Sequence, residues 1–132
     1  MASFLLHGVR EGVPMIQTFR DLQVWQKSMD LVVRIYTATE GLPRSEAFGL
    51  TSQVRRAVVS IPANVAEGKA IGGRSYPHHV KIALGSEAEL QTHIELARRL
   101  DMLDEQEASQ LIAQISEVGR MLTKLLNSLQ RN

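Results

Sequence analysis

The sequence predicts an all-α fold, an antiparallel up-down-up-down four-helix bundle with a proline-kinked second helix. Apolar residues recur every three or four positions in four separate segments, which is the period of a helix that buries one face. Short connections between these segments indicate antiparallel neighbours. The apolar residues are mainly aliphatic, and only 5% of the 132 residues are aromatic. This composition suits helices better than sheets.

The length corresponds to one domain, large enough to bury a core without disulfides or a structural metal. The chain has no cysteine, which excludes disulfides, thiolate metal sites and a cysteine nucleophile. Residues 1–17 lack periodicity and predict a loose N-terminal arm before a bundle over 18–130. The apolar run 4–6 is too short for a signal peptide or a membrane span, and no later run is long enough. We therefore expect a cytoplasmic protein with no membrane partner.

The first helix is expected over 19–40. Thr18 and Asp21 have the spacing of a capping box, which should begin this helix. We expect Trp25 to anchor its core face. The apolar stripe that should be buried consists of Leu22, Trp25, Met29, Val32 and Tyr36.

The second helix is expected over 46–68. Ser45 and Thr51 are alternative N-caps. Pro62 lies inside the pattern and should kink the helix, because proline removes a backbone donor and clashes with the carbonyl four residues earlier. Gly68 is expected to be the C-terminal cap. The apolar stripe of this helix consists of Leu50, Val54, Ala57, Ile61 and Val65.

The third and fourth helices are expected over 75–100 and 104–130. Asp104 and Glu107 form a second capping-box pattern. The fourth helix has apolar residues alternating at four and three positions, as near-parallel helix packing requires. The two predicted faces are Val80, Ala83, Leu84, Leu90, Ile94 and Ala97 in the third helix, and Leu111, Ile115, Val118, Leu122, Leu125 and Leu129 in the fourth.

The first and fourth helices each carry a second set of apolar residues. Such extra apolar surface suggests a subunit interface, although it would also be explained by a wider core face. The set consists of Val24, Leu31, Ile35, Ile112, Gly119, Met121 and Leu126.

Catalytic and metal-binding patterns are weak. His78 and His79 are adjacent and point to different helix faces. Glu89 and His93 lie one turn apart, but no second copy of that pair completes a metal site. No nucleophile elbow or phosphate-binding loop occurs. We therefore expect no catalytic residue, metal, cofactor or small-molecule substrate.

Charged residues on the second and third helices allow two interpretations. Glu67 or Glu89 would pair with Arg55 or Arg56 if these side chains lie near the core, since an unpaired buried charge is costly. Alternatively, all of these charges face solvent.

The formal net charge is only +1, but charge is unevenly distributed. Residues 55–81 contain five cations and one acid, whereas residues 87–107 are rich in acids. A basic surface of this kind, repeated around an oligomer, would hold the phosphates of RNA or DNA. Charge complementarity within or between subunits is the alternative. The tentative nucleic-acid-binding residues are Arg55, Arg56, Lys69, Arg74 and Lys81.

Four motifs resemble those of the 23S rRNA intervening-sequence protein family, also called the four-helix-bundle protein family, over about residues 19–127. The resemblance implies a ring, typically a pentamer. Some members are encoded inside insertions in bacterial 23S rRNA genes. A related branch, the accessory variability protein of diversity-generating retroelements, has a basic surface and works with a reverse transcriptase and RNA. The motifs are FRDLQVWQK (19–27), EAFGLTSQVRRA (46–57), VSIPANVAEG (59–68) and SEAELQT (86–92).

No enzymatic activity is established for that family. The resemblance therefore implies that its motif residues are structural, with Trp25 as core anchor, Pro62 as kink and Gly68 as cap. Asn64 and Glu67, beside the kink, would satisfy backbone groups that it frees.

Three functions follow as hypotheses. The leading one is a non-enzymatic homo-oligomer, pentameric by resemblance, that binds nucleic acid through the five cations. The second is a protein-interaction scaffold that does not bind nucleic acid. The third is an enzyme with a site between subunits that uses Glu89 and His93.

Overall fold

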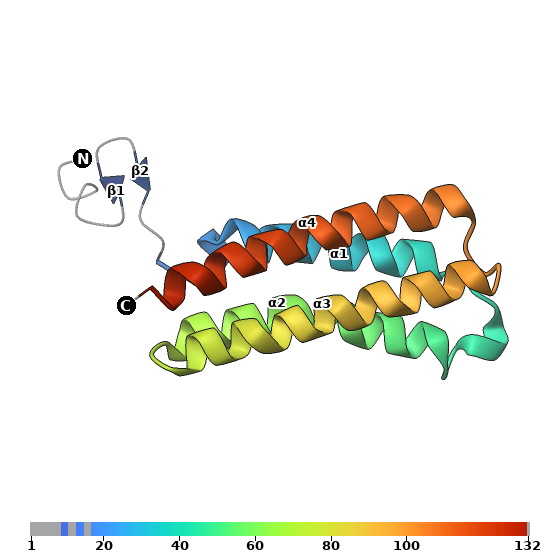
Figure 1. The fold of residues 1–132 in the computed structure, drawn as a ribbon, viewed down its shortest axis with the longest axis horizontal. Helices are drawn as coiled ribbons and strands as arrows, with labels where there is room; N and C mark the ends of the chain where they lie inside the picture. Colours follow the sequence, from blue (N-terminus) through green and yellow to red (C-terminus); the bar gives the residue numbers. More distant parts are fainter. Residues whose placement is uncertain (1–8, 11–12, 15–16, 132) are drawn as a thin grey trace.

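The computed structural model describes residues 9–10, 13–14 and 17–131. Figure 1 shows the chain reversing direction between consecutive helices, so that the four long helices lie along a common axis. The predicted all-α bundle is confirmed. The elements are β1 (Val9–Arg10), β2 (Val13–Pro14), the 3-10 helices η2 (Phe19–Asp21) and η3 (Arg44–Glu46), and the α-helices α1 (Gln23–Thr39), α2 (Leu50–Ile71), α3 (Ser75–Arg99) and α4 (Glu105–Leu129).

The N-terminal arm contains one regular feature. Strands β1 and β2 pair antiparallel, with Val9 opposite Pro14 and Arg10 opposite Val13. These four residues of the predicted loose arm are thus paired with one another, and the looseness of the arm stays a prediction. Its other residues before 17 lie outside the described part of the chain.

The first predicted helix begins as expected but is interrupted at Leu22. The Thr18 side chain accepts from Arg20 N, and the Asp21 carboxylate accepts from Thr18 N at 3.1 Å, which confirms the capping box. This box begins η2 rather than α1. Leu22 then adopts extended backbone, with ψ at 126°, so that the α-helix starts only at Gln23.

Helix α1 buries its second apolar set more deeply than the predicted stripe, of which Leu22 is buried and Trp25 and Val32 are half-buried against the core. Leu31 and Ile35 are buried, whereas Met29 and Tyr36 are each 40% exposed. The buried stripe also holds two polar residues, which satisfy their hydroxyls by donating to backbone carbonyls four residues earlier. The residues buried on α1 are Val24, Ser28, Leu31, Ile35 and Thr39.

Trp25 lies at the edge of the core rather than inside it. Its side chain is half-buried and packs against the core cluster. Its ring centroid lies 5.3 Å from that of Phe19, at an interplanar angle of 60°. Trp25 therefore joins η2 to the bundle instead of anchoring the centre of the core.

Helix α2 buries its whole predicted stripe, together with Val58 and Pro62. The helix runs through Pro62 without interruption, and the kink there stays a prediction. It begins at Leu50 because residues 47–49 form turns, and the Glu46 carboxylate accepts from Leu50 N at 3.0 Å. Neither predicted N-cap residue therefore caps the helix.

The prediction that Gly68 caps α2 is wrong. The helix continues for another turn and ends at Gly72, whose φ of 77° is the left-handed conformation that glycine adopts readily. Gly68 is instead buried where α2 meets α3. A Cβ at this position would lie 2.9 Å from the Cβ of His79 and 3.2 Å from the carbonyl oxygen of Tyr76. Glycine therefore permits the close approach of the two helices.

Helices α3 and α4 have the predicted apolar faces with few exceptions. Leu84, Leu125 and Leu129 are only half-buried, and the other predicted positions are buried. Asp104 begins α4, because its carboxylate accepts from Glu107 N at 2.7 Å. Gly119 is buried against the Glu87 side chain. The two helices complete a single aliphatic core with α1 and α2.

Candidate nucleic-acid interface

The five predicted cations lie in two separate places. Lys69 is in the last turn of α2, Arg74 is in the following turn, and Lys81 is on the first part of α3. Figure 1 places this connection at the end of the bundle where α4 finishes. Arg55 and Arg56 lie near the other end of α2, about 20 Å from Lys69 at 1.5 Å per residue. The structure therefore brings three of the five cations together.

Three further cations, which the sequence did not indicate, lie at the same end of the bundle. Arg20 is in η2, Lys124 is in the last part of α4, and Arg131 follows that helix. The antiparallel order of helices would have revealed them, because it places the C-terminus of α4 beside the α2–α3 turn. We call this set the basic end: Arg20, Lys69, Arg74, Lys81, Lys124 and Arg131.

The basic end keeps its cations available. Among the described residues, none of these six side chains has a carboxylate oxygen within 4.0 Å. The Lys69 ammonium lies 6.0 Å from the Tyr76 ring centroid, and the Arg20 guanidinium lies 4.8 Å from that of Phe19. All except the half-buried Lys69 are exposed. Positive charge therefore faces solvent from three chain segments.

A chain of polar contacts joins α2 to α3 beside the basic end. The Nδ1 atom of His79 lies 2.9 Å from the Asn64 Oδ1 atom, and its Nε2 atom lies 3.8 Å from a Glu67 oxygen. Asn64 Nδ2 donates to the Ser60 carbonyl at 2.8 Å. Pro62 lacks the N–H that would bond the Val58 carbonyl, but Asn64 donates to the Ser60 carbonyl and Glu67 contacts His79. Neither of these contacts reaches the carbonyl that Pro62 frees.

The polar chain continues to Ser86, but it contains none of the predicted glutamate–arginine pairs. Ser60 Oγ lies 2.7 Å from Ser86 Oγ across the helix interface. Glu89 contacts His93 at 3.2 Å on its own helix. Neither Glu67 nor Glu89 forms an ion pair with an arginine among the described residues. The predicted pairing is therefore wrong, because histidines occupy the positions beside both carboxylates.

The other two predicted cations line a groove over α1 and α2. Arg55 donates from Nε to Thr39 Oγ1 at 3.0 Å and from Nη2 to the Tyr36 carbonyl at 3.2 Å. Its guanidinium lies 4.4 Å from the Tyr36 ring centroid. Arg56 is exposed. The groove, of about 600 Å³, is lined by Tyr36, Ala47, Phe48, Thr51, Ser52, Arg55, Arg56, Val59 and Ser60.

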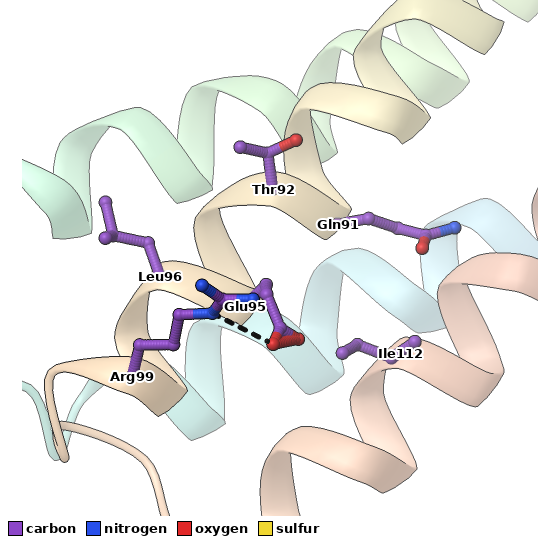
Figure 2. A pocket seen from close by; sticks show the side chains of 6 residues that line it. All are labelled: Gln91, Thr92, Glu95, Leu96, Arg99 and Ile112. Carbon is purple, nitrogen blue, oxygen red and sulfur yellow. Dashed lines mark hydrogen bonds and ion pairs between the residues drawn. The ribbon is translucent and has the colours of Figure 1, made fainter.

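A further pocket, of about 480 Å³, lies between α3 and α4. Figure 2 shows the Arg99 guanidinium turned back along α3 toward Glu95, with Ile112 projecting from α4. The Arg99–Glu95 contact is 3.5 Å. Arg98 also donates to Glu95, and this is the main reason why the pKa of Glu95 lies below its ordinary value. The charges of this pocket neutralise one another, so it is not the candidate site.

No group of three or more His, Cys, Asp or Glu side chains in the described part of the chain is placed to hold a metal ion. None of the helices that the structure describes is long and apolar enough to span a bilayer.

Comparison with known proteins identifies the family. The family model described as 23S rRNA-intervening sequence protein matches residues 20–124. The chain belongs to this family. The fold is similar to that in a crystal structure of a protein with unknown function from the S23 ribosomal protein family of Bacteroides thetaiotaomicron. The TM-score between the two structures is 0.73. That protein is 24% identical, and the match covers 79% of this chain and 95% of that one. No protein with a curated description matches the sequence.

Proposed function

We propose that this member of the 23S rRNA-intervening sequence protein family is a non-enzymatic cytoplasmic protein that self-associates and binds nucleic acid, RNA in particular. The observation that carries the proposal is the basic end, where cations from three chain segments face solvent and none has a carboxylate oxygen within 4.0 Å in the described part of the chain. Phosphate contacts supply most of the affinity of sequence-independent nucleic-acid binding. The family name fits an association with rRNA.

Self-association is supported by exposed apolar residues on two sides of the bundle. Met29 and Val33 are exposed on α1, and Ile82, Leu96 and Leu100 are exposed on α3. Contiguous exposed apolar surface marks interaction sites. Two different surfaces produce head-to-tail association, which closes into a ring when the rotation allows it. A pentamer is the ring that the family resemblance implies, and it would multiply the cations that face one ligand.

Binding is tested by fluorescence anisotropy with a labelled RNA hairpin and a DNA duplex of equal length. We expect log K to fall linearly with log salt, with a slope of roughly −2 or steeper if three or more phosphates are neutralised. Tighter binding of the hairpin would identify RNA as the preferred ligand. No binding of either probe at low salt would contradict the proposal.

Assembly is tested by light scattering. Five copies of the 14.7-kDa chain would have a mass of about 74 kDa. A monomer at micromolar concentration would contradict the ring.

A protein-interaction scaffold is the second candidate function. It is favoured by Leu96, which lines the pocket of Figure 2 and is 44% exposed, and by Leu100, one helical turn further along the chain, which is 52% exposed. In that case, reversing the charges of the basic end would disrupt a protein partner or the oligomer, and RNA affinity would be absent from the start.

A further inference from the structure

The groove over α1 and α2 has an unusually exposed aromatic wall. Phe48 lies in the turn before α2 and is 99% exposed. Val59 and Tyr36 line the same groove and are about 40% exposed. Aromatic side chains on which bases stack, combined with arginines, are the usual means of binding single-stranded nucleic acid.

Arg55 is fixed in this groove. Its two hydrogen bonds, to Thr39 Oγ1 and to the Tyr36 carbonyl, hold the guanidinium over the Tyr36 ring. The flat arginine–tyrosine pair is therefore preorganised and adds a second planar surface beside Phe48. Little side-chain entropy remains to be lost when a planar ligand binds.

The groove continues across α2 into a polar hollow of about 290 Å³ beside α3. Arg56 and Ser60 line both parts. The hollow also presents Ser86 and Glu89. In the described part of the chain, no carboxylate lies within 4.0 Å of the Arg56 guanidinium, although Glu89 lines the same hollow. Arg56 and Glu89 thus face one space without pairing with each other, whereas Ser60 and Ser86 share a hydrogen bond and one Glu89 oxygen contacts His93.

The exposed Phe48 ring, the Arg56 donors and the Glu89 acceptor favour a planar ligand that carries hydrogen-bond acceptors on one edge and hydrogen-bond donors on the adjacent edge. Guanine carries O6 and N7, which arginine contacts with two hydrogen bonds. Its neighbouring N1–H and N2–H2 groups are donors for a carboxylate. Adenine has an acceptor at N1 and would face Glu89 unfavourably. A phosphate alone would be repelled by Glu89.

We propose that this groove and the adjoining hollow together bind an unpaired guanine base of RNA, stacked on Phe48 in the groove, with O6 and N7 contacted by Arg56, which lines both, and with N1–H and N2–H2 donating to Glu89 in the hollow. The inference rests on the proposed nucleic-acid binding and assigns base recognition to a place about 20 Å from the basic end. Phosphate contacts position a nucleic acid, whereas base contacts specify its sequence.

The test uses the full chain and labelled single-stranded RNAs that differ at one position. The position holds guanine, adenine, 7-deazaguanine, which lacks N7, or hypoxanthine, which lacks the 2-amino group. We expect guanine to bind about tenfold tighter than adenine, the range of one good bidentate contact. The RNAs that carry 7-deazaguanine or hypoxanthine should bind with affinities between those of the guanine and adenine RNAs.

Three variants assign the contacts. Arg56→Lys should abolish the difference between guanine and 7-deazaguanine, and Glu89→Gln should abolish the difference between guanine and hypoxanthine. Phe48→Ala should weaken the binding of all four RNAs, while Gln106→Ala, which removes an exposed side chain on α4, should leave their affinities unchanged. Light scattering on every variant checks assembly.

Two results would overturn the inference. One is equal affinity of the wild-type protein for the guanine and adenine RNAs. The other is loss of assembly in Phe48→Ala or Arg56→Lys without any change in base preference, which would show that a second copy covers the groove. Salt-dependent RNA binding without base preference would leave the proposed function intact. An RNA affinity that charge reversal at the basic end leaves unchanged, with guanine preference intact, would contradict the basic end as the phosphate-binding surface and would leave this inference standing.

Discussion

The two ends of the bundle use their charges differently. At the end with the α1–α2 and α3–α4 connections, Arg34 lies 2.5 Å from Glu107, and Arg98 pairs with both Glu95 and Glu105. At the basic end, the described cations have no carboxylate partner. A net charge of +1 therefore conceals one end that is internally neutralised and one that offers cations to a ligand.

One hydrophobic core joins the two ends, and helix α1 crosses it with Ile35 inward and Met29 outward. Ile35→Ala should lower the free energy of unfolding by about 2–5 kcal/mol, because a buried cavity remains. Met29→Ala should lower it by less than about 1 kcal/mol, because its side chain is 40% exposed. Chemical denaturation measures both. A larger loss for Met29→Ala would mean that α1 buries the face first predicted.

Close helix packing holds the basic end together. Gly68→Ala places a methyl group 2.9 Å from the His79 Cβ atom, and such overpacking costs about 1–3 kcal/mol. Gly85→Ala is the matched control, because nothing lies within 4 Å of its new methyl group; it should stabilise by about 1 kcal/mol through helix propensity. Equal effects of the two substitutions on denaturation midpoints would contradict the close approach.

A helix cap stabilises the neutralised end. Asp104→Ala removes the acceptor for Glu107 N and should cost about 1 kcal/mol, the typical value for an N-cap. Gln106→Ala, at an exposed position in the same turn, should change the free energy of unfolding by less than about 0.5 kcal/mol. Indistinguishable unfolding curves for the two variants would argue against the cap.

The smallest effect concerns pH. Arg98 is the main cause that lowers the pKa of Glu95 in the folded protein. Because the folded pKa is depressed, the stability that this group contributes is present above its unfolded pKa and is lost as pH falls through the folded value. Arg98→Ala should raise the Glu95 pKa in an NMR titration, whereas Lys81→Ala should not. An unchanged Glu95 pKa in Arg98→Ala would contradict this assignment.

Helices α4 and α1 show how far periodicity predicts burial. The predicted stripe of α4 is buried in its first four positions, and the second apolar set of that helix lies beside it, with Gly119 buried and Ile112, Met121 and Leu126 half-buried against the same core. Helix α1 carries two apolar stripes, and the buried one includes Ser28 and Thr39. Their hydroxyls donate to the helix's own carbonyls, and Thr39 Oγ1 also accepts from Arg55 Nε, so that these polar side chains are satisfied inside the core. Periodicity does not reveal this local satisfaction.

The candidate site was predictable only in part. Lys69, Arg74 and Lys81 are close in sequence and remain close in the fold, whereas the groove combines α1, α2 and α3. Nothing in the sequence indicates that Phe48 is almost fully exposed, because an aromatic residue in an apolar segment is ordinarily expected to be buried. The contact of His79 with Asn64 depends on the close approach at Gly68, which the sequence suggested was a helix end.

The most direct test of the basic end compares two charge reversals of equal size. Lys69→Glu with Arg74→Glu changes the basic end, and Arg44→Glu with Arg99→Glu makes the same change at the other end. RNA affinity is measured against salt, with assembly checked by light scattering. The first pair should lower affinity at least tenfold at low salt and reduce the salt slope by about 1–2, while the second should change affinity less than about twofold. Equal losses for the two pairs would contradict a nucleic-acid interface at the basic end.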